Sequence, residues 1–371
     1  MILLRGGRVL DPTNGLDAVQ DVLIRDGIIA ALGPSLDPQG ARVIDVKGCW
    51  VTPGLVDLRS LVRDERDVRA ALAGGFTTLL ASPESPLAGS PLLTLRRASA
   101  LTSGLEGEEL GELPDNEICV SQGFKPLAKG GVLRRALQYL SPWSPLVMLH
   151  AEDPTLTGRG LLGEGETATR LGLLAVPSTA ETSVVARDLA IVEETGARVH
   201  FSHLTCARSV ALVREAKQRG LKVSADVTPH HLTLDDSAAE GFSLAARVWP
   251  PLRSKADVQA LVAGLKDGTI DAVAADHVRV DVLDREHPFE QCAPGCESFE
   301  TAFAQVAARV DVRRAVDALT AAPARLLRIE AGHLTKGARA DVAVFDAESR
   351  ATRLTLVGGA RRYASGGGAE P

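Results

Sequence analysis

The chain has 371 residues, enough for one large barrel domain or two ordinary domains. Hydrophobic residues make up 45% of it, so a sizeable core can be buried on folding. Charged residues make up 24%, and 41 basic against 47 acidic side chains leave a net charge of -6. This mild acidity argues against nucleic acid as the main partner.

The apolar runs and the cysteines indicate in which compartment the protein is expected. No apolar run approaches the roughly 18 residues of a membrane span, so we expect no membrane partner. The start of the chain, MILLRGGRVLDPTNG, has neither a charged leader nor a cleavage site, which predicts no signal peptide. Five scattered cysteines are typical of reduced thiols rather than of a disulfide framework, so we expect a cytoplasmic protein.

The two ends of the chain share one pattern. Short apolar runs broken by Gly, Asp and Pro begin the sequence as ILLRGGRVLDP, DVLIRDGIIAALG and ARVIDVKGCWVTPG. GHLTKGARADVAVFDAE and ATRLTLVGGARRY near the other end have the same texture. Such runs predict strands joined by tight turns. We predict that residues 1–52 and 332–371 together form one small β-sandwich domain.

Residues 53–331 alternate between strand-like and helix-like segments, which predicts an α/β fold with a parallel sheet. Eight strand candidates favour a closed (β/α)8 TIM barrel. They are LVDL, TTLLAS, a stretch near RRASALT, EICVSQ, LVMLHAE, ARVHFSHL, LKVSADVT and IDAVAADH. The helical segments between them include DVRAALAGG, GVLRRALQYL, TSVVARDLAIVEETG, SVALVREAKQRG and KADVQALVAGLKDG.

The carboxyl ends of barrel strands carry the active residues in such folds. Here those ends carry Arg59, Ser82, Gln122, His150, His203 and Asp276. The chain has eight histidines, and none of them precedes His150. A metal site that needs a histidine from the first half of the barrel therefore cannot be built.

Ten stretches in a specific order carry a family resemblance. They are PGLVDL, AALAGGFTT, LHAED, VPSTAE, SHLT, ADVTPHHLTL, PPLR, LKDGTIDAVAADH, PFEQCAPGCESFET and KGARADVAVFD. With them the chain resembles the class I dihydroorotases of the amidohydrolase superfamily over nearly its whole length. The resemblance implies a TIM barrel with an attached β-sandwich. It also implies a binuclear zinc centre that hydrolyses or closes the dihydroorotate ring in pyrimidine biosynthesis.

Half of that zinc centre lacks ligands in this chain. Arg59 and Leu61 stand where the family has its His-x-His pair. Leucine has no donor atom, and arginine is always protonated, so we interpret Arg59 as a buried or mouth-lining ion-pairing residue in place of a lost metal. Ser121 and Gln122 occupy the acidic positions of the fourth strand, and Lys125 is out of register for a carboxylated lysine. The resemblance therefore implies a degenerate member.

The later ligand positions are kept. His150 in LHAED, His203 in SHLT and Asp276 in AADH match metal ligands of the family, and Asp276 would also be the catalytic proton shuttle if the protein is active. Two histidines and one carboxylate can hold one zinc with an open position, so we expect at most one zinc per chain, or none. Cys206 is disfavoured as a fourth ligand, because a buried free cysteine is the usual case.

The substrate positions are eroded as well. Arg63 matches a substrate-binding arginine of the family and is kept. Pro83, Trp249 and Val280 replace two amides and an imidazole, which should remove affinity for dihydroorotate. For the pair His230 and His231 we favour packing and hydrogen bonding over a ligand role.

Three functions follow from these patterns. The first is a dihydroorotase homologue with impaired or absent activity and a structural role as partner of aspartate carbamoyltransferase. The second is an active cyclic-amide hydrolase that uses a reduced mononuclear zinc site and a different substrate. The third is a regulator that binds a carboxylate or phosphate at Arg59 and Arg63. In each case we expect a homo-oligomer or a hetero-oligomer.

Overall fold

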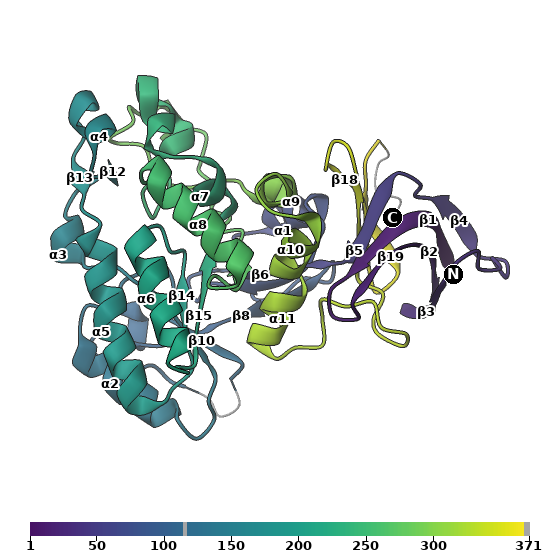
Figure 1. Cartoon of the computed structure of the whole chain (residues 1–371), viewed down its shortest axis with the longest axis horizontal. Coiled ribbons are helices and arrows are strands. Elements are labelled where there is room, and N and C mark those ends of the chain that lie inside the picture. The colour runs from purple at the N-terminus through teal and green to yellow at the C-terminus, as the bar shows by residue number, and fades with distance from the viewer. Residues whose placement is uncertain (114–116, 367–371) are drawn as a thin grey trace. The chain divides into compact units, whose positions relative to one another are not determined.

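The structure is a computed structural model that describes residues 1–113 and 117–366. Its internal contacts divide the chain into two units (Figure 1). Unit 1 comprises Met1–Leu80, Pro86–Arg96 and Ser298–Pro371, and unit 2 comprises Ala81–Ser85 and Arg97–Glu297. The predicted domain limits, 1–52 with 332–371 and 53–331, stay a prediction.

Strands from both ends of the chain form one eight-stranded sheet in unit 1. Its order is β19-β18-β17-β5-β1-β2-β3, with β4 paired to β1. The fifth strand joins the two ends, because Val51 pairs with Val9 of β1 on one side and with Val344 of β17 on the other. The predicted pairing of the chain ends is thereby confirmed. The strands are β1 (Ile2–Asp11), β2 (Leu16–Arg25), β3 (Ile28–Gly33), β4 (Arg42–Asp45), β5 (Cys49–Pro53), β17 (Val342–Asp346), β18 (Thr352–Val357) and β19 (Ala360–Ala364).

Unit 1 also holds four helices and a three-stranded sheet of order β6-β7-β8. The first helix, α1, has a capping box in which Asp64 and Asp67 satisfy backbone donors of its first turn. It packs against α9 so closely that a Cβ on Gly74 would lie 2.1 Å from the carbonyl oxygen of Phe299. The elements are β6 (Leu55–Ser60), α1 (Glu65–Ala73), β7 (Phe76–Ala81), β8 (Thr94–Arg97), α9 (Phe299–Ala307), α10 (Val312–Leu319) and α11 (Ala321–Leu327).

A six-stranded parallel sheet of order β16-β15-β14-β11-β10-β9 organises unit 2. Its central strands are buried along their whole length, as is typical of parallel sheets covered on both faces. The strands are β9 (Ser99–Ala100), β10 (Cys119–Ser121), β11 (Leu146–His150), β14 (Val199–Ser202), β15 (Val223–Val227) and β16 (Ala272–Val273).

Helices alternate with these strands along the chain. The long ones are α2 (Gly130–Leu140), α5 (Thr179–Thr195), α6 (Ala207–Gln218) and α8 (Lys255–Asp267). The short elements are η1 (Ser103–Leu105), α3 (Pro154–Thr157), β12 (Leu162–Gly163), α4 (Glu166–Leu171), β13 (Ala175–Val176), α7 (Pro229–Thr233), η2 (Asp236–Phe242), η3 (Leu244–Ala246) and η4 (Asp284–Glu286). Alternation of this kind produces the right-handed crossovers of a parallel sheet.

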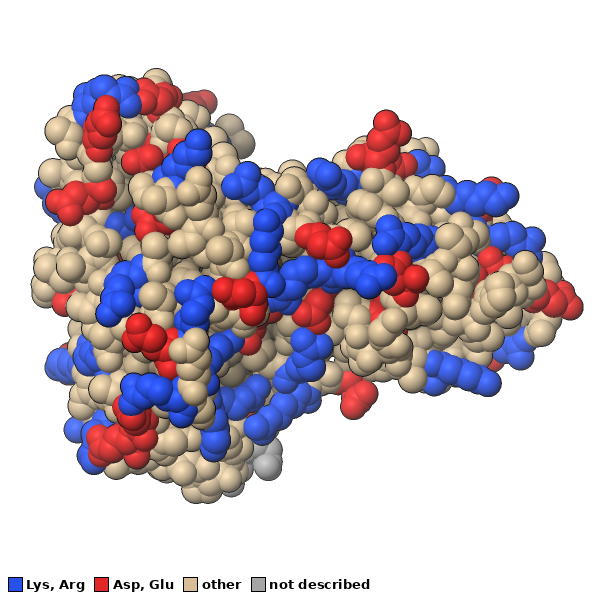
Figure 2. Space-filling view, in the orientation of Figure 1, with Lys and Arg blue, Asp and Glu red and all other residues tan. Residues whose placement is uncertain are grey.

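All eight predicted strand segments contain a strand, which confirms the mixed α/β character. The first three map to β6, β7 and the β8–β9 region, and the other five to β10, β11, β14, β15 and β16. Closure into one eight-stranded barrel stays a prediction. Within residues 1–113 and 117–366, no helix is both long and apolar enough to cross a membrane. On the face drawn in Figure 2, basic and acidic side chains are interspersed rather than gathered by sign.

A buried aspartate on α5 generates a prediction about pH and stability. Asp188 is 2% exposed and accepts a hydrogen bond of 2.7 Å from Arg187 Nε. Burial raises the pKa of Asp188 from 3.8 to about 6, although the bond and charge of Arg187 oppose the shift. A carboxyl whose pKa is raised on folding adds stability below its unfolded pKa and loses it as the pH rises through its folded pKa.

We therefore expect Asp188→Asn to gain stability relative to the wild type between about pH 4 and pH 6, by up to about 3 kcal/mol. The amide stays neutral and can still accept from Arg187. Urea unfolding of both proteins at several pH values measures the difference. Parallel stability curves from pH 4 to pH 7 would show that this carboxyl is not strained by burial.

Candidate functional site

Three of the predicted site residues lie at the carboxyl edge of the parallel sheet in unit 2. His150 is the last residue of β11, His203 directly follows β14, and Asp276 follows β16 by three residues. These strands share one sheet and one direction, so their ends meet at one edge. The strand-end placement agrees with the sequence pattern, whereas the roles of the three residues stay predictions.

Asp226, the next-to-last residue of β15, organises this edge. Its Oδ1 accepts from the backbone N–H of His203 at 2.6 Å and lies 2.7 Å from His203 Nδ1. Its Oδ2 lies 2.9 Å from His200 Nε2, whose other ring nitrogen is 2.8 Å from Ser224 Oγ. Burial raises the pKa of Asp226, but the charge of His203 and the two histidine bonds outweigh burial and hold this pKa well below its usual range. Asp226 is therefore an ionised anchor that orients both imidazoles.

His203 links this anchor to Asp276. With Nδ1 directed at Asp226, the opposite nitrogen Nε2 lies 3.0 Å from Asp276 Oδ1. Both His203 and Asp276 are almost fully buried, and both have a positive φ, at 57° and 51°. Residues other than glycine adopt this backbone region rarely, and such strain clusters at functional sites. The backbone thus places one imidazole between two carboxyl groups.

The two histidines of α7, His230 and His231, have different surroundings. His231 matches the predicted hydrogen-bonding role, with its ring nitrogens 2.7 Å from Thr228 Oγ1 and 3.0 Å from the carbonyl oxygen of Pro250. His230 does not, because neither of its ring nitrogens has a hydrogen-bond partner within the described residues. Burial lowers the pKa of His230 to about 4, with the charge of Asp276 opposing this shift. His230 is therefore a neutral, buried imidazole near Asp276.

His150 faces a different partner. Its Nε2 lies 2.8 Å from Glu152 Oε2, and the same oxygen accepts a hydrogen bond of 2.9 Å from Trp249 Nε1. Burial raises the pKa of Glu152, but the bond and charge of His150 and the Trp249 bond bring it below its ordinary value. Across residues 1–113 and 117–366, no group of three or more His, Cys, Asp or Glu side chains is arranged to hold a metal ion. The structure therefore does not bring His150 together with His203 and Asp276.

A small cavity adjoins this carboxylate. It is lined by His150, Glu152, Thr157, Glu181, Trp249 and Arg253, among others, and its free volume is ≈ 10 Å³. Such a volume has room for about one water molecule. The indole of Trp249 and the carboxylate of Glu152 therefore leave no room for a ring-shaped substrate at this point.

The two arginines of the first strand lie in unit 1. Arg59 belongs to β6 and is 3% exposed, so it is buried, whereas its ion-pairing role stays a prediction. Arg63 follows the strand with an exposed side chain, and its backbone N–H donates to Asp67 Oδ2 at 2.7 Å. The substrate-binding role of Arg63 stays a prediction.

Comparisons with known proteins now bear on this geometry. The amidohydrolase family matches residues 169–363, just over half of the chain. A dihydroorotase of Anaeromyxobacter dehalogenans is 41% identical over 95% of this chain and 90% of its own length. A dihydroorotase of Citrifermentans bemidjiense is 37% identical over 93% of this chain and 89% of its own length. The chain belongs to the dihydroorotase family of amidohydrolases.

Solved structures agree with the family on the fold. A D-hydantoinase superposes with a TM-score of 0.80 at 24% identity, covering 97% of this chain and 94% of its own. The dihydropyrimidinase of Brevibacillus agri gives a TM-score of 0.81 at 21% identity, with the same coverage. At such low identity these likenesses show the fold alone.

At the fourth-strand position of this dihydroorotase homologue, the amide of Gln122 serves the fold. Its Oε1 accepts from Thr102 Oγ1 at 3.0 Å, and its Nε2 donates to the carbonyl oxygen of Leu105 at 3.1 Å. Lys125, disfavoured above as a modified ligand, is half-exposed and pairs with Glu106 at 3.4 Å. Both side chains are thus committed to their neighbours.

Several residues of this site were missed from the sequence. Glu84, from the loop after β7, accepts from the backbone N–H of Phe124 at 2.8 Å and so brings a carboxylate to the end of β10. Glu181 on α5 accepts from the backbone N–H groups of Thr205 and Cys206, at 3.0 and 3.1 Å. Both contacts join segments more than 20 residues apart in the sequence, so no local sequence pattern predicts them.

Cys206 is a buried free cysteine, as the sequence suggested. Its side chain is buried, and burial raises the pKa of the thiol. Metals bind the thiolate, which such a pKa disfavours at neutral pH. Arg253 of the PPLR motif donates to Thr205 Oγ1 at 3.2 Å and to the carbonyl oxygen of Val176, so its guanidinium is structural.

Replacing the central carboxylate tests the anchor. Asp226→Asn should lower the free energy of unfolding by about 3–5 kcal/mol at pH 7, because it breaks a buried charged network. The pKa of Asp226 is depressed on folding, so its contribution is present above about pH 5 and is lost only as the pH falls through the folded pKa. Urea unfolding measures the change, with the exposed Asp267→Asn as matched control. A loss below about 1 kcal/mol would refute the anchoring role.

Replacing Trp249 tests the closed cavity. Trp249→Ala should destabilise the protein by about 2–4 kcal/mol and create an indole-shaped space beside His150. Added indole should then raise the melting temperature of the variant but not of the wild type. Trp249→Phe serves as the control, because it removes the N–H donor to Glu152 while a six-membered aromatic ring still fills most of the space. Equal responses of all three proteins to indole would contradict this assignment.

Proposed function

We propose that this protein is a dihydroorotase homologue with impaired or absent activity, and that its role in pyrimidine biosynthesis is structural, as a partner of aspartate carbamoyltransferase. The observation that carries the proposal is the end of the first barrel-type strand. There Arg59 is buried and Leu61 follows it, where the family resemblance requires two metal-binding histidines.

The chemistry of the donors supports the loss of the binuclear centre. Hydrolysis of this class needs a cation that lowers the pKa of bound water. Leu61 offers no donor, and the fixed positive charge of Arg59 repels a metal ion. Gln122 at the fourth strand brings a neutral amide whose atoms are bonded to Thr102 and Leu105. The residues present therefore do not fit two zinc ions.

The residues at the family's substrate positions also argue against dihydroorotate. Trp249 replaces an asparagine of the family motif, and its N–H is committed to Glu152. Pro83 and Val280 lack the amide and imidazole groups of the corresponding family positions. A site built to hydrogen-bond a substrate group rejects an analogue that lacks this group by a factor of about 10⁴–10⁵. Loss of the site's own polar groups breaks the same hydrogen bonds. These losses accumulate at the chemical positions, whereas the scaffold motifs are kept.

One sample decides between impaired and working catalysis. We expect dihydroorotate turnover roughly a thousandfold below that of the Anaeromyxobacter dehalogenans relative assayed beside it, a loss of about 4 kcal/mol of transition-state stabilisation. Zinc analysis of the same protein, expressed with zinc, should find at most one ion per chain. Turnover equal to that of the relative would overturn the proposal.

The structural role has a separate test. Co-expression with the aspartate carbamoyltransferase of the same organism should give a complex that co-elutes in size-exclusion chromatography. Each protein should also raise the melting temperature of the other, because a partner that binds only the folded state stabilises it. If the two neither co-elute nor change each other's stability, the partner role fails, whatever the turnover result.

A second candidate function is a cyclic-amide hydrolase with one zinc held by His150, His203 and Asp276. His203 and Asp276 already lie 3.0 Å apart, and the neutral His230 is near them, which favours this alternative. His150 would first have to leave Glu152. About one zinc per chain that is lost in His150→Ala would support the alternative, and metal-free protein after expression with zinc would end it.

A further inference from the structure

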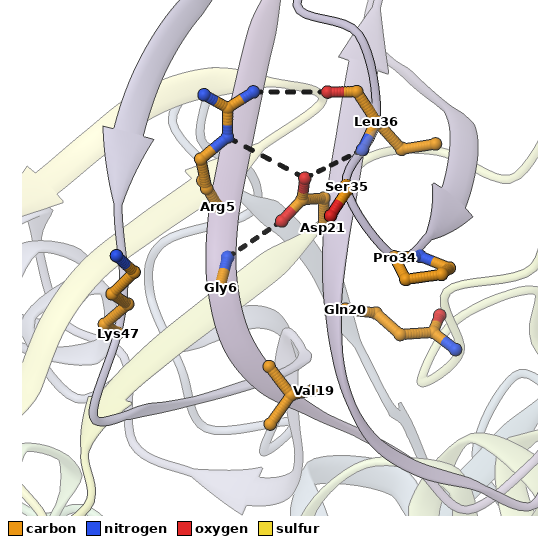
Figure 3. Close-up of a pocket in the computed structure, with 9 residues that line it drawn as sticks. All are labelled: Arg5, Gly6, Val19, Gln20, Asp21, Pro34, Ser35, Leu36 and Lys47. Atoms are coloured by element: carbon orange, nitrogen blue, oxygen red, sulfur yellow. Dashed lines mark hydrogen bonds and ion pairs between the residues drawn. The ribbon is translucent and has the colours of Figure 1, made fainter.

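A hollow on the large sheet of unit 1 has the features of a ligand site (Figure 3). It has a volume of ≈ 390 Å³ and lies between β1, β2, the loop after β3 and the turn before β5. Small-molecule sites span about 300–1,000 Å³. None of the residues discussed for catalysis lines it, so it requires an explanation of its own.

A bulge in β1 creates the hollow. The pairing of β1 with β2 shifts register between Leu4 and Gly7. Gly6 within this bulge has a φ of +77°, which side chains rarely allow, and a Cβ there would lie 2.9 Å from Lys47 Cγ. The missing side chain therefore lets the stem of Lys47 lie directly against β1.

Asp21 holds the walls of the hollow in place. It is 4% exposed, and its two oxygens accept from the backbone N–H groups of Gly6 and Leu36, both at 2.9 Å. Arg5 Nε lies 3.8 Å from the same carboxylate, and Arg5 Nη2 donates to the carbonyl oxygen of Leu36 at 3.2 Å. Figure 3 shows Asp21 between Arg5, Gly6 and Leu36. The carboxylate of Asp21 thus joins β1 to the loop after β3 and also orients the guanidinium of Arg5.

The remaining polar groups leave a positive excess. Arg5 and Lys47 face one carboxylate, so the charged side chains that line the hollow sum to +1 in a chain of net charge -6. Within the described residues, the ammonium of Lys47 and the second terminal nitrogen of Arg5 have no hydrogen bond or ion pair. Cationic donors of this kind are typical of sites for carboxylate or phosphate oxygens.

Apolar side chains complete the lining. Val19 is 66% exposed on β2, and Pro34 and Leu36 belong to the loop after β3. An exposed valine on a strand is ordinary by itself, but here it borders two cations. The combination suits a small molecule that has an anionic group at one end and an apolar body at the other.

We propose that this hollow binds a small oxyanion, with Lys47 and Arg5 on its carboxylate or phosphate group and Val19 with Pro34 against its apolar part. The shared chemistry is a compact group of negatively charged oxygens. The site is independent of the proposed function, because its residues lie on the terminal sheet and carry none of the hydrolase motifs.

Lys47 is the side chain to change. Arg5→Gln would remove the bond to Leu36 and disturb the loop, whereas the ammonium of Lys47 has no partner to lose within residues 1–113 and 117–366. The test uses the full chain, with phenyl phosphate and benzoate as probes and phenol as the neutral control, in saturation-transfer NMR at constant ionic strength. Lys222→Gln, on another exposed lysine, is the matched control.

We expect saturable binding of at least one anionic probe, no binding of phenol, and an affinity about tenfold weaker in Lys47→Gln but unchanged in Lys222→Gln. Lys47→Arg should keep most of the affinity, and Val19→Glu should abolish it by placing a negative charge at the rim. The stronger of the two probes identifies phosphate or carboxylate as the group bound. Absence of saturable binding, or equal affinities of Lys47→Gln and Lys222→Gln, would overturn the proposal.

Discussion

The ionised carboxylate of Asp226 is the constraint on which the candidate site depends. It is buried in a parallel strand and is held in its charged form by His200 and His203. A buried charge without partners would cost several kcal/mol, so both imidazoles must stay in place while the fold exists. That requirement turns His203 Nε2 toward Asp276, at 3.0 Å. The geometry at the strand ends follows from this one buried anion, whether or not the edge performs chemistry.

A second carboxylate, that of Glu152, determines the surroundings of His150 at the same sheet edge. Glu152 receives both His150 Nε2 and Trp249 Nε1 on one oxygen, which ties a strand-end imidazole to a large ring. A hydrogen bond to a charged group is worth about 1.5–3 kcal/mol. Any ligand of His150 must offset that bond. It must also displace the indole of Trp249, which lines the adjoining cavity of ≈ 10 Å³. Glu152 thus contacts His150, and Asp226 contacts His203, through pairings that the spacing of the motifs does not reveal.

Patterns of short range were readable from the sequence, and most side-chain contacts of long range were not. The alternation of apolar runs and helices located all eight strand segments, because such elements depend on local periodicity. The pairing of the chain ends joins residues as distant as Val51 and Val344, and its prediction rested on the shared texture of the two ends and on the family resemblance. Ser224 and Asp226 are two apart in an otherwise apolar strand, a period-two signal that could have identified the anchor. Glu84 and the missing partners of His230 left no such trace, because they depend on which loop or ring arrives from elsewhere.

The protein partners of the acidic groups in unit 2 have a physical consequence. In a metal-dependent site, ligand histidines and carboxylates are mutually repelling or desolvated until a cation neutralises them. Here the acidic groups at the strand ends have protein partners instead: Asp226 has two histidines, Glu152 has His150 and Trp249, and Glu84 has a backbone N–H. Arg59 adds a permanent buried cation in the first unit. Protein partners of this kind stabilise buried acidic groups without a cation.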